Sequence, residues 1–159
     1  QKELGSSNAE INTSPRKYSE NVRIAQFVAG PYLHEEEIEA IVATGPQAIV
    51  IHGTGLGHLP IDDPGKDAPE NTKVWRALTR CVNRNIPVVI TSQCLHGPID
   101  MNVYSKGRKQ QEMGLLGHGS VTSPDSTTVK IHYALSNNKD VAKILSQNLC
   151  GENLNVLRE

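Results

Sequence analysis

Three glycines alternate with other residues in the segment Gly53-Thr54-Gly55-Leu56-Gly57-His58, directly after an apolar run. Because glycine has no side chain, such a segment lets the backbone turn sharply and come close to a ligand. A dinucleotide-binding fingerprint needs Gly-x-Gly-x-x-Gly at the start of a helix, whereas here the third glycine comes one residue early and a loop follows. We therefore interpret the segment as a ligand-binding loop with Thr54 and His58 as its polar residues, in which the alternating glycines are expected to let Thr54, Leu56 and His58 point outward in turn. The alternative is a tight turn without a ligand.

Histidine and cysteine side chains follow two of the predicted strands. His52 and His58 flank the glycine loop, and Cys94 and His96 follow the next strand. If these strands are neighbours, the side chains would gather at one sheet edge, an arrangement that suits zinc or a Cys–His nucleophile. However, no ligand pair has the i, i+4 spacing of a helix, no acidic residue stands beside these histidines to orient them, and a lone cysteine commonly packs as a small apolar residue. We therefore predict no metal site.

Three short strands are predicted, at residues 22–28, 47–52 and 87–91. The second and third are continuously apolar, which indicates burial on both faces, as in a parallel sheet. The alternation of strands and helices predicts right-handed crossover connections and an α/β layered fold.

Four amphipathic helices are predicted around this sheet. The first spans residues 34–44, and the second follows Asn71 as its N-cap. Near the C-terminus, Ser123-Pro124 is typical of an N-cap followed by proline at the first helical position. A last apolar stripe, from Val141 to Leu149, indicates a helix that ends before Gly151.

Composition and charge exclude several classes of function. The 159 residues suffice for one domain, and a net charge of −1 without a basic stripe argues against direct binding to nucleic acid or a membrane surface. Three cysteines form no disulfide or zinc pattern, and no segment approaches the ~20 apolar residues that span a bilayer, so a soluble cytoplasmic protein is expected. Residues 1–20 are polar and are predicted to form a linker or flexible tail before a domain at 21–159. Because the first residue is Gln1, we expect a processed chain or a piece of a longer protein.

Several segments together resemble one family. They are Thr91-Ser92-Gln93-Cys94, Met101-Asn102-Val103-Tyr104-Ser105 and Gly107-Arg108, with the glycine loop, Asn148-Leu149 and Gly151-Glu152 in matching positions. The chain resembles the C-terminal domain of the asparaginase-like family, which includes type I L-asparaginases and the D subunit of archaeal glutamyl-tRNA(Gln) amidotransferase. Leu56 and His58, together with Lys17-Tyr18-Ser19-Glu20 before the first strand, favour the amidotransferase branch.

This resemblance implies a flavodoxin-like three-layer sandwich with a short parallel sheet, the C-terminal domain of the asparaginase/glutaminase fold. It implies a fragment of an amidase subunit that hydrolyses glutamine (or asparagine) to supply ammonia for converting Glu-tRNA(Gln) to Gln-tRNA(Gln). The active site would form between an N-terminal amidase domain and the C-terminal domain of a homodimer partner, with Thr54, Gly55, Gly57 and His58 binding substrate. The nucleophilic threonine belongs to the N-terminal domain, so no catalytic residue is expected in this chain.

The implied partners are the N-terminal amidase domain, a homodimer partner and the E subunit of the amidotransferase. The E subunit would use ATP and Mg²⁺, whereas this chain would hold no cofactor and meet tRNA only indirectly. His96 and Pro98 depart from the tyrosine and arginine usual in the family, and the segment 122–125 carries one more residue than the family's helix start. Two alternatives stay open: the C-terminal domain of a cytoplasmic type I L-asparaginase, and an autonomous flavodoxin-like ligand-binding module.

Overall fold

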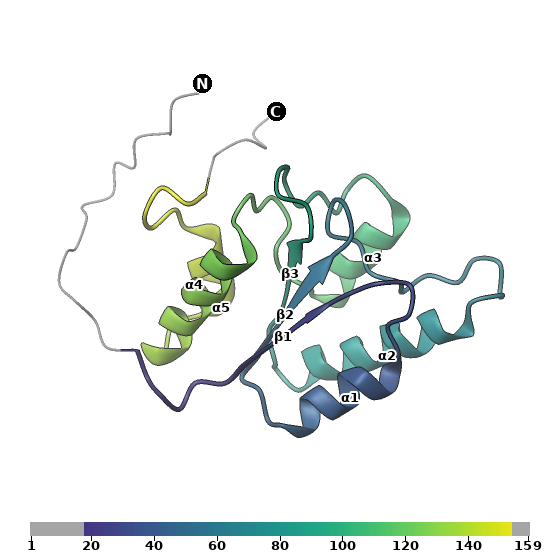
Figure 1. Ribbon diagram of the computed structural model, residues 1–159, viewed down its shortest axis with the longest axis horizontal. Coiled ribbons are helices and arrows are strands. Elements are labelled where there is room, and N and C mark those ends of the chain that lie inside the picture. The colour runs from purple at the N-terminus through teal and green to yellow at the C-terminus, as the bar shows by residue number, and fades with distance from the viewer. Residues whose placement is uncertain (1–17, 154–159) are drawn as a thin grey trace.

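A parallel sheet of three strands forms the centre of the protein. The computed structural model describes residues 18–153 of the chain (Figure 1). The strands are β1 (Ile24–Val28), β2 (Ala48–Gly53) and β3 (Val88–Ser92), in the order β1-β2-β3. Both neighbouring pairs run parallel. The predicted strands and their parallel pairing are therefore confirmed.

Helices cover both faces of this sheet (Figure 1). On one face α1 (Glu35–Ala43) packs against α2 (Pro69–Asn83), and α3 (Ser105–Met113) lies next to α2. On the other face lie α4 (Pro124–Ser136) and α5 (Val141–Ser146), which pack against each other. This arrangement confirms the expected three-layer α/β sandwich. None of the helices within the described residues is long and apolar enough to cross a bilayer.

The alternating side chains of β2 build two separate hydrophobic cores. Ile49 and Ile51 belong to a core that includes Ile38 of α1, whereas Val50 belongs to a second core with Ile131 of α4. All five side chains are fully buried. Because burial of each such side chain contributes about 1.5–3 kcal/mol, a strand that is apolar on both faces is stable only between two helical layers.

Two predicted helix starts had different outcomes. The start of α4 is confirmed, because the Ser123 hydroxyl accepts the backbone N–H of Ser126 at 3.2 Å. The prediction for α2 is wrong: the helix begins at Pro69, so Ala68 rather than Asn71 is the N-cap. Proline has the helical φ built in and therefore starts the helix earlier. The Asn71 side chain instead donates to a backbone carbonyl of the preceding loop at 2.8 Å.

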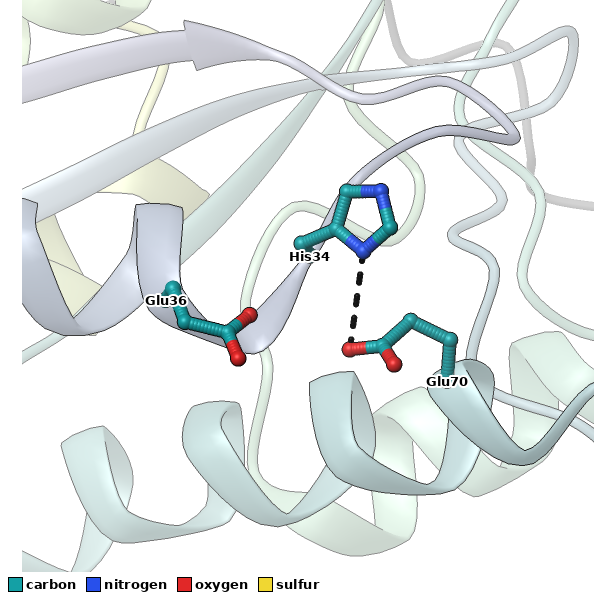
Figure 2. Close-up of side chains that lie close together, drawn as sticks. All are labelled: His34, Glu36 and Glu70. Carbon is teal, nitrogen blue, oxygen red and sulfur yellow. Dashed lines mark ion pairs between the residues drawn. The ribbon is translucent and has the colours of Figure 1, made fainter.

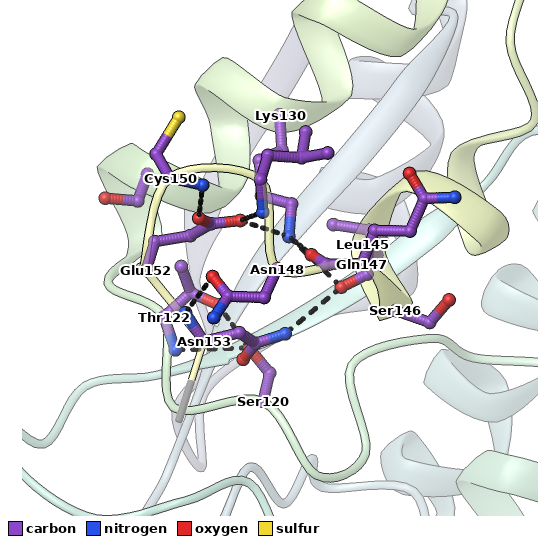
Figure 3. Close-up of polar contacts among 12 residues, drawn as sticks. Ser120, Thr122, Lys130, Leu145, Ser146, Gln147, Asn148, Cys150, Glu152 and Asn153 are labelled. Atoms are coloured by element: carbon purple, nitrogen blue, oxygen red, sulfur yellow. Dashed lines mark hydrogen bonds and ion pairs between the residues drawn. The ribbon is translucent and has the colours of Figure 1, made fainter. Parts of the chain in front are cut away.

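An ion pair between a buried lysine and a partly buried glutamate holds the loop that follows α5 (Figure 3). This helix ends at Ser146, short of the end predicted just before Gly151. The Lys130 Nζ of α4 lies 2.7 Å from Oε1 of Glu152 and 2.6 Å from the carbonyl oxygen of Gln147. Two backbone N–H groups of the loop also donate to the Glu152 carboxylate. The loop therefore folds around the Lys130 ammonium group instead of continuing the helix.

Helix α3 was not predicted, because it lacks an apolar stripe. Its buried residues are Gly107 and Gln110. A Cβ atom at Gly107 would lie 2.3 Å from the carbonyl oxygen of Met101, so the helix approaches the preceding segment at a distance that only glycine permits. The position of α3 thus depends on a close backbone approach and a buried amide.

Contacts with α4 begin at the first described residue. The rings of Tyr18 and His132 lie 4.9 Å apart between centroids, and the backbone N–H of Ser19 donates to the Ser136 hydroxyl at 2.9 Å. The prediction of a linker over residues 1–20 falls outside the described residues for 1–17. The boundary of the domain at residue 21 stays a prediction.

Candidate functional site

The glycine loop closes on itself at the carboxyl end of β2. The backbone N–H of Thr54 donates to the carbonyl oxygen of His58 at 3.0 Å, and the N–H of His58 donates back to the carbonyl oxygen of Thr54 at 2.9 Å. Gly55 and Gly57 have φ values of 51° and 92°, in the left-handed region that favours glycine. A Cβ atom at Gly57 would also lie 2.9 Å from the Ile99 side chain. The glycines are therefore required by this turn.

The loop that follows β3 fastens the glycine loop to the strand ends. The Ser92 hydroxyl donates to the carbonyl oxygen of Gly55 at 2.6 Å. The Gln93 side-chain amide donates to the carbonyl oxygens of Ala29 and His52, at 2.6 and 2.8 Å. One side chain thus joins the ends of β1 and β2. Carboxyl ends of parallel strands are where ligands bind in α/β sheets, and here hydrogen bonds from Ser92 and Gln93 join the segments at that edge.

Helix α3 holds the glycine loop from the opposite side. Gln110 is fully buried, and its amide makes two hydrogen bonds to the loop. The side-chain Nε2 donates to the carbonyl oxygen of Gly57 at 2.9 Å, and Oε1 accepts the backbone N–H of Leu59 at 2.9 Å. These two bonds bracket His58, the residue between Gly57 and Leu59.

His58 is buried and keeps one ring nitrogen unpaired. Its side chain is 5% exposed, and its ring meets the Tyr104 ring edge-on with 5.0 Å between centroids. The Nε2 atom is buried and has no hydrogen-bond partner in the described part of the chain. Burial lowers the pKa of His58 below its ordinary value, the Lys106 ammonium lowers it further, and Asp100 acts in the opposite direction. The ring is therefore neutral at physiological pH.

The predicted outward positions hold for one residue of the loop and fail for another. Thr54 is exposed, as expected for a residue between two glycines. His58 was expected to point outward, and this expectation is wrong, because the segment after Gly57 turns inward toward α3 and Tyr104. Whether these side chains bind substrate stays a prediction.

The family of the chain follows from a comparison of its sequence with known families. Residues 21–146 match the glutaminase/asparaginase C-terminal domain. The chain belongs to this family. The glycine loop, both loops at the carboxyl edge and α3 all lie within the matched residues of the glutaminase/asparaginase C-terminal domain.

Two curated relatives are the same subunit of one kind of enzyme, taken from two organisms. The D subunit of glutamyl-tRNA(Gln) amidotransferase from Methanobrevibacter smithii is 39% identical over 125 residues, covering 77% of this chain and 26% of the relative. The corresponding D subunit from Thermococcus kodakarensis is 33% identical over 139 residues, covering 86% of this chain and 28% of the relative. The chain therefore spans about a quarter of the length of the relatives that it matches.

A solved structure shows the same fold. The crystal structure of L-asparaginase I from Vibrio cholerae matches with a TM-score of 0.68 and 25% sequence identity, covering 82% of this chain and 37% of that one. The expected fold of an asparaginase-family C-terminal domain is thus confirmed.

The histidines and Cys94 of this glutaminase/asparaginase domain do not assemble into a ligand cluster. His52 follows Val50 on the strand face toward α4, whereas Cys94 and His96 are exposed in the loop after β3. Among the residues that the structure describes, only His34, Glu36 and Glu70 bring three ligand atoms within 4.8 Å of one another.

The cluster of His34, Glu36 and Glu70 lies at the first turns of α1 and α2 (Figure 2). The His34 Nδ1 atom is 3.6 Å from Oε1 of Glu70, and the Lys73 ammonium occupies the other Glu70 oxygen at 3.0 Å. Two helix N-termini and the Lys73 ammonium already interact favourably with these carboxylates, and exposed acidic groups of this kind are common without a bound cation. The cluster is best explained as helix capping and helix docking.

Residues outside the predicted set also shape the site. Gln110, Gln93 and Tyr104 form the surroundings of the loop, yet none was proposed as a site residue. Gln93 and Tyr104 lie in segments on which the family resemblance rests. The resemblance therefore singled out these segments but assigned no role in the site to either residue. Gln110 is 51 residues from Leu59 in sequence, and no local sequence pattern indicates this contact.

Proposed function

We propose that the chain is the C-terminal module of the amidase subunit of a tRNA-dependent amidotransferase. The whole amidase would hydrolyse glutamine (or asparagine) and supply ammonia for converting Glu-tRNA(Gln) to Gln-tRNA(Gln). The identity of 39% with the D subunit from Methanobrevibacter smithii, over 77% of the chain, is the observation that carries this proposal. The glycine loop at the carboxyl edge of the sheet supports it with a suitable place for substrate.

The proposed role of the glycine loop is substrate binding. Thr54 and His58 would contact the polar ends of the amino acid, and Gly55 and Gly57 would let the backbone approach it. A buried polar atom without a partner costs free energy, so the unpaired Nε2 of His58 is best explained by a ligand that pairs with it.

The nucleophile is proposed to come from elsewhere in the whole protein. Amide hydrolysis needs an activated nucleophile and donors for the oxyanion. Thr54 and Ser92 are the hydroxyls of the loop region, and each donates to a backbone carbonyl oxygen of the loop. Within residues 18–153, neither hydroxyl is hydrogen-bonded to a histidine ring, so this chain is assigned binding and no catalytic role.

The proposed partners complete the site and use its product. They are an N-terminal amidase domain, a homodimer partner that shares the active site, and the E subunit of the amidotransferase, which would use ATP and Mg²⁺ to activate Glu-tRNA(Gln). This chain itself is proposed to bind no cofactor and to reach tRNA only through that complex. A cytoplasmic location fits the three free cysteines, two of which are exposed.

A type I L-asparaginase is the second candidate. The resemblance to L-asparaginase I from Vibrio cholerae, with a TM-score of 0.68, favours it at the level of the fold. The two candidates differ in what happens to the ammonia, because an asparaginase releases it and an amidotransferase delivers it to tRNA-bound glutamate.

The deciding experiment uses the full-length protein that contains this chain. Ammonia release from glutamine and from asparagine is measured with and without the E subunit, ATP and Glu-tRNA(Gln). The amidotransferase proposal expects ammonia release and formation of Gln-tRNA(Gln) when the E subunit is present. Ammonia release from asparagine without tRNA amidation would establish the asparaginase instead, and absence of release from either amide would overturn both.

A further inference from the structure

The fully buried amide of Gln110 accounts for the placement of His58. We propose that Gln110 is a positioning residue that fixes the His58 segment of the glycine loop in its substrate-binding conformation. This inference rests on the proposed function of the loop and assigns a role in it to a residue of α3.

The backbone of residues 57–59 is completely hydrogen-bonded. The N–H groups of Gly57 and His58 both donate to the carbonyl oxygen of Thr54, and the carbonyl oxygen of His58 accepts the Thr54 N–H. The carbonyl oxygen of Leu59 accepts the N–H of Ile61. The two remaining groups, the Gly57 carbonyl and the Leu59 N–H, both pair with Gln110.

This pairing leaves His58 Nε2 as the buried polar atom of the segment without a partner. The loop itself fixes one side of the His58 backbone through Thr54, and α3 fixes the other side through Gln110. A side chain with a donor and an acceptor on the same amide group can satisfy both groups at once, which an apolar residue of equal size cannot do. Gln110 thus acts on the ligand only through His58.

Two substitutions at Gln110 can distinguish a positioning role, which needs both hydrogen bonds, from simple filling of the core, which needs neither. Methionine has nearly the length of glutamine and fills the same space without either bond. A glutamic acid side chain mimics the amide while it is protonated, because its O–H can donate to Gly57 and its other oxygen can accept from Leu59. Burial raises the pKa of such a carboxyl group, so the mimicry lasts until the pH rises above that raised value.

The first experiment needs no enzymatic activity. The ring of His58 is titrated by NMR in the 159-residue chain and in its Gln110→Met and Gln111→Met variants. The pKa of His58 depends on its burial and on Lys106 and Asp100, so a displaced ring should titrate closer to its ordinary value. We expect this shift in Gln110→Met and not in Gln111→Met, because the side chain of Gln111 bonds to Asn102 instead of the loop.

The second experiment measures KM and kcat for glutamine in the full-length enzyme. Gln110→Met should raise KM about tenfold, as expected when a conformation loses about two net hydrogen bonds, and should leave kcat largely unchanged. With KM measured over a pH series, Gln110→Glu should match wild type while its carboxyl group is protonated and approach the Gln110→Met value as the pH rises through the pKa that burial has raised. Wild-type enzyme at each pH is the reference.

The outcomes distinguish this inference from the proposed function. An unchanged His58 titration in a folded Gln110→Met chain, or a Gln110→Glu to wild-type KM ratio that does not change with pH, would overturn the positioning role. If the full-length protein hydrolyses no amide, the proposed function fails, and the His58 titration still decides whether Gln110 positions the ring. If Gln110→Met does not fold, the pH dependence of Gln110→Glu decides.

Discussion

At the scale of single residues, His58 and the nearby hydroxyl groups differ in what remains available to a ligand. Thr54 and Ser92 both donate to backbone carbonyls of the glycine loop, so their donor hydrogens are in use. The His58 Nε2 atom has no partner among the described residues, and the lowered pKa keeps the ring neutral, so this nitrogen can donate or accept according to its tautomer. A neutral imidazole of this kind recognises a ligand without requiring a charge.

Replacing His58 by alanine in the full-length enzyme should weaken substrate binding more than it slows the reaction. A contact made equally in the ground state and the transition state raises KM when it is lost and leaves kcat largely unchanged. We expect KM for glutamine to rise by about tenfold, measured by steady-state ammonia release. His96→Ala, on the exposed loop after β3, serves as the matched control and should behave as wild type. A large loss of kcat at constant KM would instead place His58 in the chemical step.

The residues of the site could be predicted where their identity depends on local sequence. Thr54 and His58 stand out because Thr54 lies between two glycines and His58 directly follows a third, just after a strand. Gln110 could not be predicted, because its two partners lie 51 and 53 residues away and glutamine in a polar helix is ordinarily exposed. Long-range polar pairing leaves no periodic signal.

At the scale of elements, the predicted helices follow from local sequence patterns, whereas α3 depends on long-range contacts. The strands, α1 and α4 follow from apolar periodicity and from proline at a helix start. In α3, the inward positions are taken by Gly107 and Gln110, so the helix has no apolar stripe and was missed. The start of α2 and the end of α5 were also misplaced, because Pro69 and the Lys130–Glu152 pair determine them.

The Lys130–Glu152 pair should make the C-terminal loop sensitive to acid. Burial alone would raise the pKa of Glu152, but Lys130 and the loop N–H groups outweigh it and lower this pKa from 4.5 to about 2. The folded protein therefore favours the ionised carboxylate, and this stabilisation is complete above pH 4.5 and is lost as the pH falls toward 2. The shift corresponds to about 3 kcal/mol of unfolding free energy.

Urea unfolding of Glu152→Gln measures this contribution. At neutral pH we expect the variant to lose about 3 kcal/mol of unfolding free energy, because the buried Lys130 side chain loses its counter-ion. The difference from wild type should shrink as the pH falls from 4.5 to about 2. Glu112→Gln, at an exposed position of α3, is the control and should change stability by less than about 0.5 kcal/mol at both pH values. A difference that does not depend on pH would refute the assignment.

At the scale of the whole molecule, the chain corresponds to one part of the longer relatives that it matches. It spans 26% and 28% of the two amidotransferase subunits that it resembles. The fold class of this part could be predicted from continuously apolar strands and alternating helices. A reaction could not be predicted from the residues of this fold alone, because in the described part of the chain neither the Thr54 nor the Ser92 hydroxyl is hydrogen-bonded to a histidine ring.

The 159-residue chain by itself should release no ammonia from glutamine or asparagine above background. The proposed substrate binding through His58 and the glycine loop would lower no chemical barrier without an activated nucleophile and oxyanion donors. A coupled assay with glutamate dehydrogenase detects the ammonia, with the full-length protein as the positive control and buffer as the background. Release of ammonia by the purified chain that disappears in its Thr54→Ala variant would show that the loop contains the nucleophile. Release that persists in Thr54→Ala and survives a second purification would place a nucleophile elsewhere in the chain and refute the prediction, whereas release lost on repurification would come from a contaminating amidase.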